Sequence, residues 1–473
     1  MTEPRTTHPE DAAPSKDPPG SLSLARTIAR RTMAPIERFL AIQAASGVLL
    51  VIVSAIAILW ANSRYAPVYA ALWHTTVGLK LGTFAFERDL HFWINDGAMA
   101  VFFFVVGLEI RRELHNGELS EWRRAMLPLA AALGGMIVPA VIYAALNRGA
   151  PTVRGWGVPM ATDIAFAVGV LALLGRRVPP AARVLLLALA VIDDVGGIIV
   201  IALFYSGGIA LDGVAIAAAG IAMILVLQAF GARRPWLYLP PAALLWSGML
   251  RSGIHPTLAG VVVGLLTPVR AWLGRPAFVQ RVREHLGELS ATPAPSQPAV
   301  LDQLDAINDA RREAVSPVDR LQHAFHSTVA FVIMPLFALS NAGVRVSATS
   351  FDLAQRPVVL GIALGLCLGK PIGITLGSLA AVKLGVAVLP RGMRWSHVAL
   401  VGALGGVGFT VSLFIATLAF SSGVALDAAK TAILLASVLS AALSLLVARV
   451  VLRPELAPDA AQTESEAEAS TAK

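Results

Sequence analysis

The chain has 473 residues, of which 56% are hydrophobic and 14% charged, and its net charge at pH 7 is +8. Apolar runs near 20 residues recur along it with Gly and Pro inside them, which is typical of a polytopic helical membrane protein. The basic residues lie in short stretches between these runs, so the charge does not indicate a nucleic-acid partner. The single cysteine, Cys367, excludes an internal disulfide.

Both ends of the chain are polar, and we expect residues 1–38 and 454–473 to be disordered tails. Between them the apolar runs predict an all-α membrane protein of about twelve transmembrane helices, eight within 39–268 and four within 324–453. Their approximate ranges are 39–62, 94–112, 126–147, 157–174, 184–206, 212–230, 236–250, 253–268, 324–343, 357–380, 397–420 and 428–449. Lys and Arg are more abundant on the side of both termini, which predicts cytoplasmic termini.

Two connections are long enough to carry structure of their own. In residues 75–88, alternating apolar residues predict a short external β-hairpin that turns near Gly82. An isolated hairpin is marginally stable, which favours contact with a partner. Residues 269–323 are expected to form a cytoplasmic loop insertion with one surface amphipathic helix, whose apolar face carries Leu301, Leu304 and Ile307.

The most unusual stretch is Leu186–Tyr205, where Asp193 and Asp194 are adjacent in an otherwise almost wholly apolar run. Each acid at the centre of a membrane helix costs roughly 2.5 to 3.5 kcal/mol, so two of them call for a function. Low-dielectric surroundings and mutual repulsion disfavour two bare charges side by side. The pair is therefore expected to hold either a proton or a bare cation.

Lys370 is the one cation predicted at membrane depth, and pairing with an acid is the natural way to keep it charged. Successive helix positions differ by about 100°, so Asp193 and Asp194 cannot both face the same partner. One of them can pair with Lys370 while the other faces a water-filled funnel.

Two predicted spans contain signs of interruption. Thr162 and Asp163 follow Pro159, and Gly405, Gly406 and Gly408 occupy a corresponding place in the other half of the chain. Such matching positions predict inverted repeats whose interrupted helices cross near the membrane midplane. Asp163 would then offset the positive helix ends and Lys370 the negative ones. Taken alone, the glycines are also typical of close helix packing.

Four further polar residues leave alternatives open. Glu109 and Glu113 fit either an ordinary helix end or a cytoplasmic funnel for protons and cations. Asp96 is expected to be a structural acid such as a helix cap. His255 fits a hydrogen-bonded packing residue as well as a pH-responsive group.

These residues lie in runs that resemble the NhaA-type sodium/proton antiporters, which are among the transporters from which inverted repeats with broken helices are known. The resemblance covers nearly every span in order and leaves out the tails and most of 269–323. The matching runs are WINDGAMAVFFFVVGLEIRREL, GGMIVPA, ATDIAFAVGVLALLG, LALAVIDDVGGIIVIALFY, SGIHPTLAGVVVG, MPLFALSNAGV, LGKPIG and GGVGFTVSLFIATLAF.

The resemblance implies pH-regulated exchange of cytoplasmic Na⁺ or Li⁺ for external protons across a bacterial inner membrane, with no cofactor. It implies that Asp194 is the main cation-binding carboxylate and that Asp193, paired with Lys370, carries protons. Thr162 and Asp163 would lie at the crossing, and the hairpin would join a homodimer. One departure is Gln322 before His323, where the family usually has an acid, so the pH of activation is expected to be shifted.

Two other functions also use acids within a membrane. An intramembrane aspartyl protease needs two acids on different helices, but its GxGD and YD motifs are absent, and adjacent aspartates cannot hold a peptide bond from opposite sides. A cation channel is lined by rings of acids, and the buried Lys370 argues against an open cation pore. We therefore expect a transporter rather than an enzyme. The expected mechanism is competition between Na⁺ and protons for the same carboxylates. Na⁺ prefers oxygen ligands, which the acids supply only when they are deprotonated.

Overall fold

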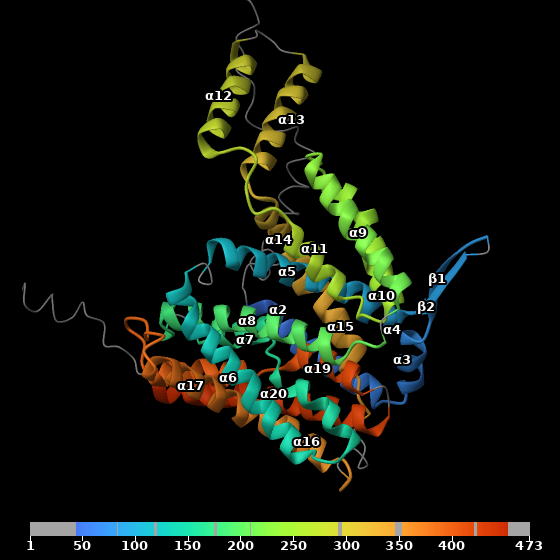
Figure 1. Cartoon of the computed structure of the whole chain (residues 1–473), viewed down its shortest axis with the longest axis vertical. Coiled ribbons are helices and arrows are strands. Elements are labelled where there is room, and N and C mark those ends of the chain that lie inside the picture. Colours follow the sequence, from blue (N-terminus) through green and yellow to red (C-terminus); the bar gives the residue numbers. More distant parts are fainter. Residues whose placement is uncertain are drawn as a thin grey trace, which may run out of the picture.

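The computed structural model describes residues 44–82, 84–117, 121–174, 177–208, 210–291, 296–345, 352–420 and 423–452. The two tails predicted to be disordered and the first residues of the first predicted span lie outside these ranges. The described chain is mostly helical, and its β1 and β2 strands form a two-stranded antiparallel sheet (Figure 1).

The helices of the first half pack into the body of the molecule, and the sheet follows the second of them. In chain order these elements are α2 (Ala44–Ala61), α3 (Ala66–Trp73), β1 (Thr76–Leu81), β2 (Phe84–Asp89), α4 (Leu90–Phe92), η1 (Trp93–Ala98), α5 (Met99–Asn116), α6 (Trp122–Leu146), η3 (Pro151–Met160), α7 (Ile164–Leu173), α8 (Pro180–Phe204), α9 (Leu211–Ala229), η5 (Pro235–Tyr238), α10 (Leu239–Ser252) and α11 (Leu258–Leu266). The elements α4, η1 and α5 follow one another without a break and form a single helical run.

The second half begins with a pair of helices that projects from the body, visible at the top of Figure 1. Its elements are α12 (Arg275–Ala291), α13 (Gln297–Ala314), α14 (Pro317–Thr328), η6 (Val329–Ile333), α15 (Met334–Asn341), α16 (Arg356–Leu364), η8 (Gly365–Gly369), α17 (Lys370–Lys383), α18 (Trp395–Gly405), α19 (Phe409–Ala419) and α20 (Val424–Val451). Three of the elements named η (η1, η6 and η8) are π-helical turns inside longer helices.

Within the described residues, seven helices are long and apolar enough to cross a membrane, and ten spans result if three bent pairs each count as one. The bent pairs are α2 with α3 (114°), η3 with α7 (43°) and α18 with α19 (50°). Helices α10 and α11 have 14 and 9 residues, fewer than the roughly 20 that span a bilayer. A helical membrane protein is therefore confirmed, and the number of twelve spans stays a prediction.

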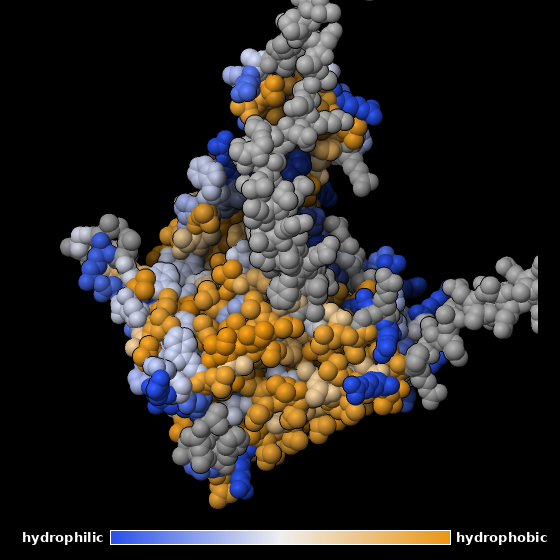
Figure 2. All heavy atoms as spheres, turned by 180° about the vertical axis from the view of Figure 1, so that it is seen from behind, coloured by the Kyte–Doolittle hydropathy of each residue, from blue (hydrophilic) through white to orange (hydrophobic). Residues whose placement is uncertain are grey.

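The outer surface of the helical body has the apolar character that a lipid environment requires. Figure 2 shows a broad hydrophobic area on the body, with hydrophilic residues at its rim and on the projecting part. Large apolar side chains such as Leu203 (72% exposed) and Leu211 (80% exposed) contribute to the exposed surface. Exposure of this kind is unfavourable in water and favourable against acyl chains.

The hairpin has the predicted position and turn. Its strands pair from Thr76 with Asp89 to Leu81 with Phe84, and Gly82 adopts a positive φ of 60° at the turn. Lys80 pairs with Glu87 across the strands at 2.7 Å. At the base, the Trp93 indole donates a hydrogen bond to the Val77 carbonyl at 2.9 Å, which anchors the hairpin on η1.

The connection over 269–323 differs in part from the prediction. The amphipathic helix is present as α13, but a second helix, α12, precedes it and packs against it. Helix α12 was not predicted, although Phe278, Val282 and Leu286 recur along it at intervals of four positions. The next span also begins earlier, at Pro317, because Ser316 caps the helix by accepting a hydrogen bond from the Asp319 N–H at 3.1 Å.

Candidate functional site

The two adjacent aspartates lie in the middle of α8, on the part of the helix that faces the protein interior. Asp193 is 3% exposed and Asp194 is 8% exposed. Helix α8 also buries Leu186, Leu189 and Ile201 within the apolar core. Both carboxylates are therefore held away from lipid.

Lys370 is fully buried and forms an ion pair with the Asp193 Oδ2 atom. The same ammonium also donates a hydrogen bond to the carbonyl of Met160, at the C-terminal end of η3. The predicted pairing of Lys370 with one of the two acids is confirmed, and so is its position at a negative helix end. The lysine directly follows the π-helical turn η8, a feature that often occurs at functional sites.

Thr162 connects this ion pair to the other half of the chain. Its hydroxyl oxygen lies 2.6 Å from Asp193 Oδ2 and 3.0 Å from the carbonyl oxygen of Gly405. A hydroxyl has one proton, so it donates to one of these acceptors at a time. The Asp193 Oδ1 atom is buried and has no hydrogen-bond partner among the described residues. That oxygen is therefore available to a proton or a cation.

Asp163 caps two half-helices at once. Its Oδ1 atom accepts a hydrogen bond from the Phe166 N–H of α7 at 3.0 Å. Its Oδ2 atom accepts from the Thr410 N–H of α19 at 3.1 Å and also from the Thr410 hydroxyl. A carboxylate placed between two helix N-termini offsets both positive ends, as predicted.

The glycines of the second break allow the two interruptions to touch. The Asp163 N–H donates to the Val407 carbonyl at 2.7 Å, so the two unwound segments are joined through the backbone. A Cβ atom at Gly406 would lie 2.5 Å from the Leu366 carbonyl, and one at Gly408 would lie 3.1 Å from the Ala161 carbonyl. The glycines therefore serve both predicted purposes, an interrupted helix and close helix packing, at the same residues.

Asp194 has a different charge environment from Asp193. The negative groups that act on it are Asp193, Glu109 and Asp163, and Lys370 is the positive one. Glu109 comes from α5, which packs against α8 through Val106, Ile110 and Val191. Within the described residues, no three His, Cys, Asp or Glu side chains gather closely enough to hold a metal ion. A cation bound here would need hydroxyl or carbonyl oxygens besides the two aspartates.

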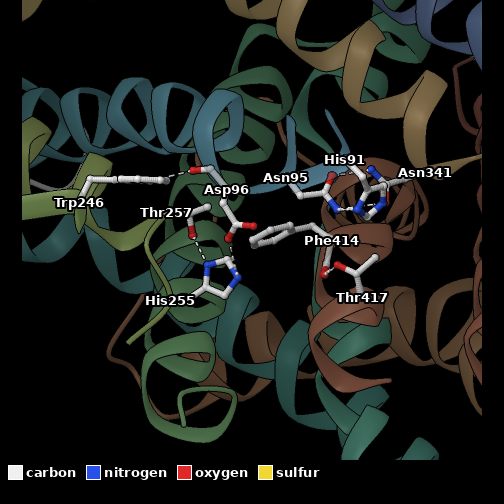
Figure 3. Close-up of polar contacts among 9 residues, drawn as sticks. All are labelled: His91, Asn95, Asp96, Trp246, His255, Thr257, Asn341, Phe414 and Thr417. Atoms are coloured by element: carbon white, nitrogen blue, oxygen red, sulfur yellow. Dashed lines mark hydrogen bonds and ion pairs between the residues drawn. The ribbon is translucent and has the colours of Figure 1, made fainter. Parts of the chain in front are cut away.

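A second polar cluster lies between the N-terminal end of the η1–α5 run and the loop before α11. In Figure 3 the Asp96 carboxylate points toward His255, with Oδ1 and Nε2 separated by 3.5 Å. The His255 Nδ1 atom lies 2.8 Å from the Thr257 hydroxyl, and its ring packs edge-on against Phe414. Asp96 lies inside a continuous helical run, so the expectation of a helix cap is wrong. The cap is Asp89, which accepts from the Phe92 N–H at 2.8 Å.

His255 lies apart from Glu109 and Glu113, the other two residues predicted for a funnel or a pH response. Its partner Asp96 precedes Glu109 by 13 positions on the same helical run, which corresponds to about 20 Å along the axis. Glu109 and Glu113 lie four positions apart, near the other end of α5. The structure therefore separates a cluster around His255 from the two glutamates.

Sequence reasoning missed three polar residues that the structure brings to these clusters. Thr410 contacts Asp163, and Asn95 and Asn341 exchange hydrogen bonds of 3.4 and 2.8 Å on the other side of Phe414 (Figure 3). Thr410 lies two positions after Gly408, at the start of the second half-helix. Its place directly after a predicted break was the one signal that could have found it.

Two broken helices that meet through their backbones around buried, compensating charges define a secondary transporter. The comparison with known proteins gives its family. The chain belongs to the family described as Na+/H+ antiporter 1, which it matches over residues 37–448. The resemblance seen in the motifs is confirmed.

Individual relatives match over nearly their full length. The chain is 53% identical to the Na(+)/H(+) antiporter NhaA 2 of Sorangium cellulosum over 457 residues, which cover 96% of this chain and 98% of the relative. It is 52% identical to the antiporter NhaA 2 of Myxococcus xanthus, with 89% and 90% covered. It is 49% identical to the antiporter NhaA of Janthinobacterium, with 90% and 94% covered. The chain is therefore grouped with bacterial membrane antiporters.

Proposed function

We propose that this protein is an electrogenic Na⁺/H⁺ antiporter that moves cytoplasmic Na⁺ or Li⁺ outward in exchange for external protons. The observation that carries the proposal is the difference between the two adjacent carboxylates of α8. Asp193 is neutralised by Lys370, whereas Asp194 lies among acids and forms no ion pair within the described residues. Such a site requires a proton or a cation at Asp194.

The mechanism is competition for the same oxygen atoms. Na⁺ is a hard cation that binds oxygen ligands, and the carboxylates offer theirs only when they are deprotonated. A cytoplasmic cation displaces the protons, and the loaded site then reorients across the membrane. A site without a proton or cation would carry uncompensated charge through a low-dielectric region, which is too costly to cross. This prevents a leak and couples the two ion flows.

The remaining site residues have supporting roles. Asp194 is the main cation ligand, and Asp193 contributes its unpartnered Oδ1 atom and exchanges a proton while Lys370 balances its charge. Asp163 and Thr162 hold the two interrupted helices together, so that their contact can shift as a unit. If both aspartates exchange protons against one monovalent cation, each cycle moves net charge.

Access to the site involves the two ends of the η1–α5 run. Glu109 and Glu113 would attract cations and protons in a cytoplasmic funnel, and the Asp96–His255 pair would lie toward the external side. This assignment assumes twelve spans that form inverted repeats in the inner membrane. The 269–323 insertion and the tails 1–38 and 454–473 then lie in the cytoplasm.

Gln322, which replaces an acid, lies within α14 with its amide oxygen buried and without a hydrogen-bond partner among the described residues. The pH that activates transport would therefore be shifted.

Everted membrane vesicles test the proposal directly. Their interior is acidified by respiration, and proton efflux on adding Na⁺ or Li⁺ is followed as dequenching of an acridine dye. The parent protein should give cation-dependent dequenching, and Asp194→Asn should reduce it to the level of vesicles without the protein. In reconstituted vesicles, an imposed membrane voltage should change the rate of exchange, because each cycle moves net charge.

Asp212→Asn provides a matched control, because Asp212 is also an aspartate on a membrane helix but is exposed and pairs with Arg251 at 2.6 Å. This control should retain parental dequenching at equal protein levels. Retained Na⁺-dependent dequenching in Asp194→Asn would remove that residue from the central role. A steady ohmic current instead of saturable, proton-coupled flux would support a channel.

A further inference from the structure

The second half-helix of the crossing, α19, has no cap from its own sequence. Its N-cap residue is Gly408, which has no side chain, so the first N–H groups of the helix depend on partners from elsewhere in the chain. The Phe409 N–H donates to the hydroxyl oxygen of Ser437 at 3.0 Å, and the Thr410 N–H donates to Asp163. Helix α20 and the N-terminal end of α7 therefore supply the cap that the glycine cannot.

Ser437 lies inside the protein, on the side of α20 that faces the break. It is 1% exposed, and it is 28 positions away from Phe409 in the sequence. Helix α20 runs without interruption from Val424 to Val451 and packs against α18, α19 and the π-helical turn η8. A hydroxyl on a continuous helix thus holds the start of an interrupted one.

The next turn of α20 contacts the same break and also the turn that precedes Lys370. A Cβ atom at Gly406 would lie 3.0 Å from the Ser440 hydroxyl oxygen. That hydroxyl also lies 3.5 Å from the Cys367 Sγ atom, which belongs to η8. Residues three positions apart share one face of a helix. Ser437 and Ser440 therefore face both the interrupted helix and the turn that leads to Lys370.

The contact at Ser437 is connected to the ion site in few steps. Asp163 binds the start of α19, and it is one of the negative groups that act on Asp194. Thr162, the residue before it, contacts Asp193 through its hydroxyl. A displacement of α19 from α20 would therefore move both of these residues relative to the carboxylates of α8.

We propose that Ser437 is a positioning residue for ion exchange, whose hydroxyl fixes the start of α19 on α20 and thereby sets the geometry of the crossing. This role rests on the proposed antiport function. A buried N–H without an acceptor is unfavourable, so loss of the hydroxyl displaces the start of α19 toward another acceptor. The cation ligands are then less well placed, and the affinity for the cation falls. Turnover at saturating cation is retained, because the carboxylates and Lys370 are unchanged.

The test measures initial rates of dequenching in everted vesicles over a range of Na⁺ concentrations at a fixed pH, which gives an apparent KM and a maximal rate. Ser437→Ala removes the hydroxyl and should raise the apparent KM by about threefold to tenfold, the range expected for one lost hydrogen bond. The maximal rate should stay near that of the parent. Ser437→Thr keeps the hydroxyl and should keep the parental KM.

Ser444→Ala is the matched control. Ser444 is also a fully buried serine of α20, but its hydroxyl donates within the same helix, to the Ser440 carbonyl at 2.7 Å. This variant should keep the parental KM, and thermal unfolding in detergent shows which variants remain folded. A parental KM in Ser437→Ala, an equal increase in Ser444→Ala or Ser437→Thr, or a lower maximal rate at unchanged KM would each overturn the proposal.

The parent protein separates the role of Ser437 from the proposed function. Na⁺-dependent dequenching in the parent, with the same apparent KM in Ser437→Ala, would contradict the positioning role alone. A parent protein without Na⁺-dependent dequenching would contradict the antiport function on which that role rests.

Discussion

Lys370 makes two neighbouring aspartates unequal. Its ammonium pairs with Asp193 and with the Met160 carbonyl, and it lies in a site where its own side chain is fully buried. Removing one partner of a buried ion pair leaves an uncompensated charge, whereas removing both often has little effect. A variant that lacks one partner of the Lys370–Asp193 pair should therefore be less stable than a variant that lacks both.

This separation gives a prediction for Lys370→Met. The single variant leaves Asp193 without its cation and should lose about 3 to 5 kcal/mol of unfolding free energy, seen as a lower Tm in detergent. The double variant Lys370→Met with Asp193→Asn should recover most of that loss. A double variant no more stable than the single one would contradict the assigned pairing.

At the scale of elements, close approach of helices explains several glycines. Helices α6 and α17 touch backbone to backbone: a Cβ at Gly377 would lie 2.2 Å from the Ala130 carbonyl, and one at Gly134 would lie 2.1 Å from the Gly373 carbonyl. Small residues four positions apart allow such contacts in membranes. Because α17 carries Lys370 at its start, this contact also positions the ion pair.

We expect Gly377→Val to separate α6 from α17 and to destabilise the protein by about 1 to 3 kcal/mol, the usual effect of overpacking. Thermal unfolding in detergent measures the change. Gly287→Val is the control, because a Cβ at Gly287 of α12 meets no atom within 4 Å. If Gly377→Val had the same Tm as Gly287→Val, the close contact would have no energetic role.

At the scale of the whole molecule, the hairpin extends beyond the helical body, as Figure 1 shows on its right side. Two strands alone are marginally stable in water, and Trp93 anchors this hairpin near its base, through the Val77 carbonyl of β1 and the Phe86 ring of β2. A second copy of the chain would supply the missing partner. We therefore infer that the hairpin joins two protomers.

Replacing residues 77–88 with a short glycine–serine linker should convert the dimer into a monomer, because the joining strands are then absent. Native mass spectrometry of the detergent-solubilised protein measures the two species. The control variant carries the same glycine–serine linker in place of residues 292–295, between α12 and α13. It should remain a dimer. Dimers that persist without the hairpin would show that another surface joins the protomers.

Much of the fold was predictable because lipid imposes simple rules on sequence. Long apolar runs, the hairpin alternation and the amphipathic helix α13 were all visible in the pattern. The π-helical turns η1, η6 and η8 were not, because a single i→i+5 turn leaves the apolar periodicity almost unchanged. Helix α12 was missed because its many charged residues make it less apolar than the membrane helices, although Phe278, Val282 and Leu286 recur at helical spacing.

The sequence by itself determined the class of this protein, because acids and a lysine inside apolar runs are costly in lipid whatever their partners are, and the resemblance of its motifs determined the family. Only the tertiary structure showed the contacts: Asp193 with Lys370, Asp163 with Thr410 247 positions away, and His255 with Asp96. These pairs depend on how helices distant in the chain are rotated and how closely their backbones approach. Local sequence patterns predict neither the rotation of the helices nor the distance between their backbones.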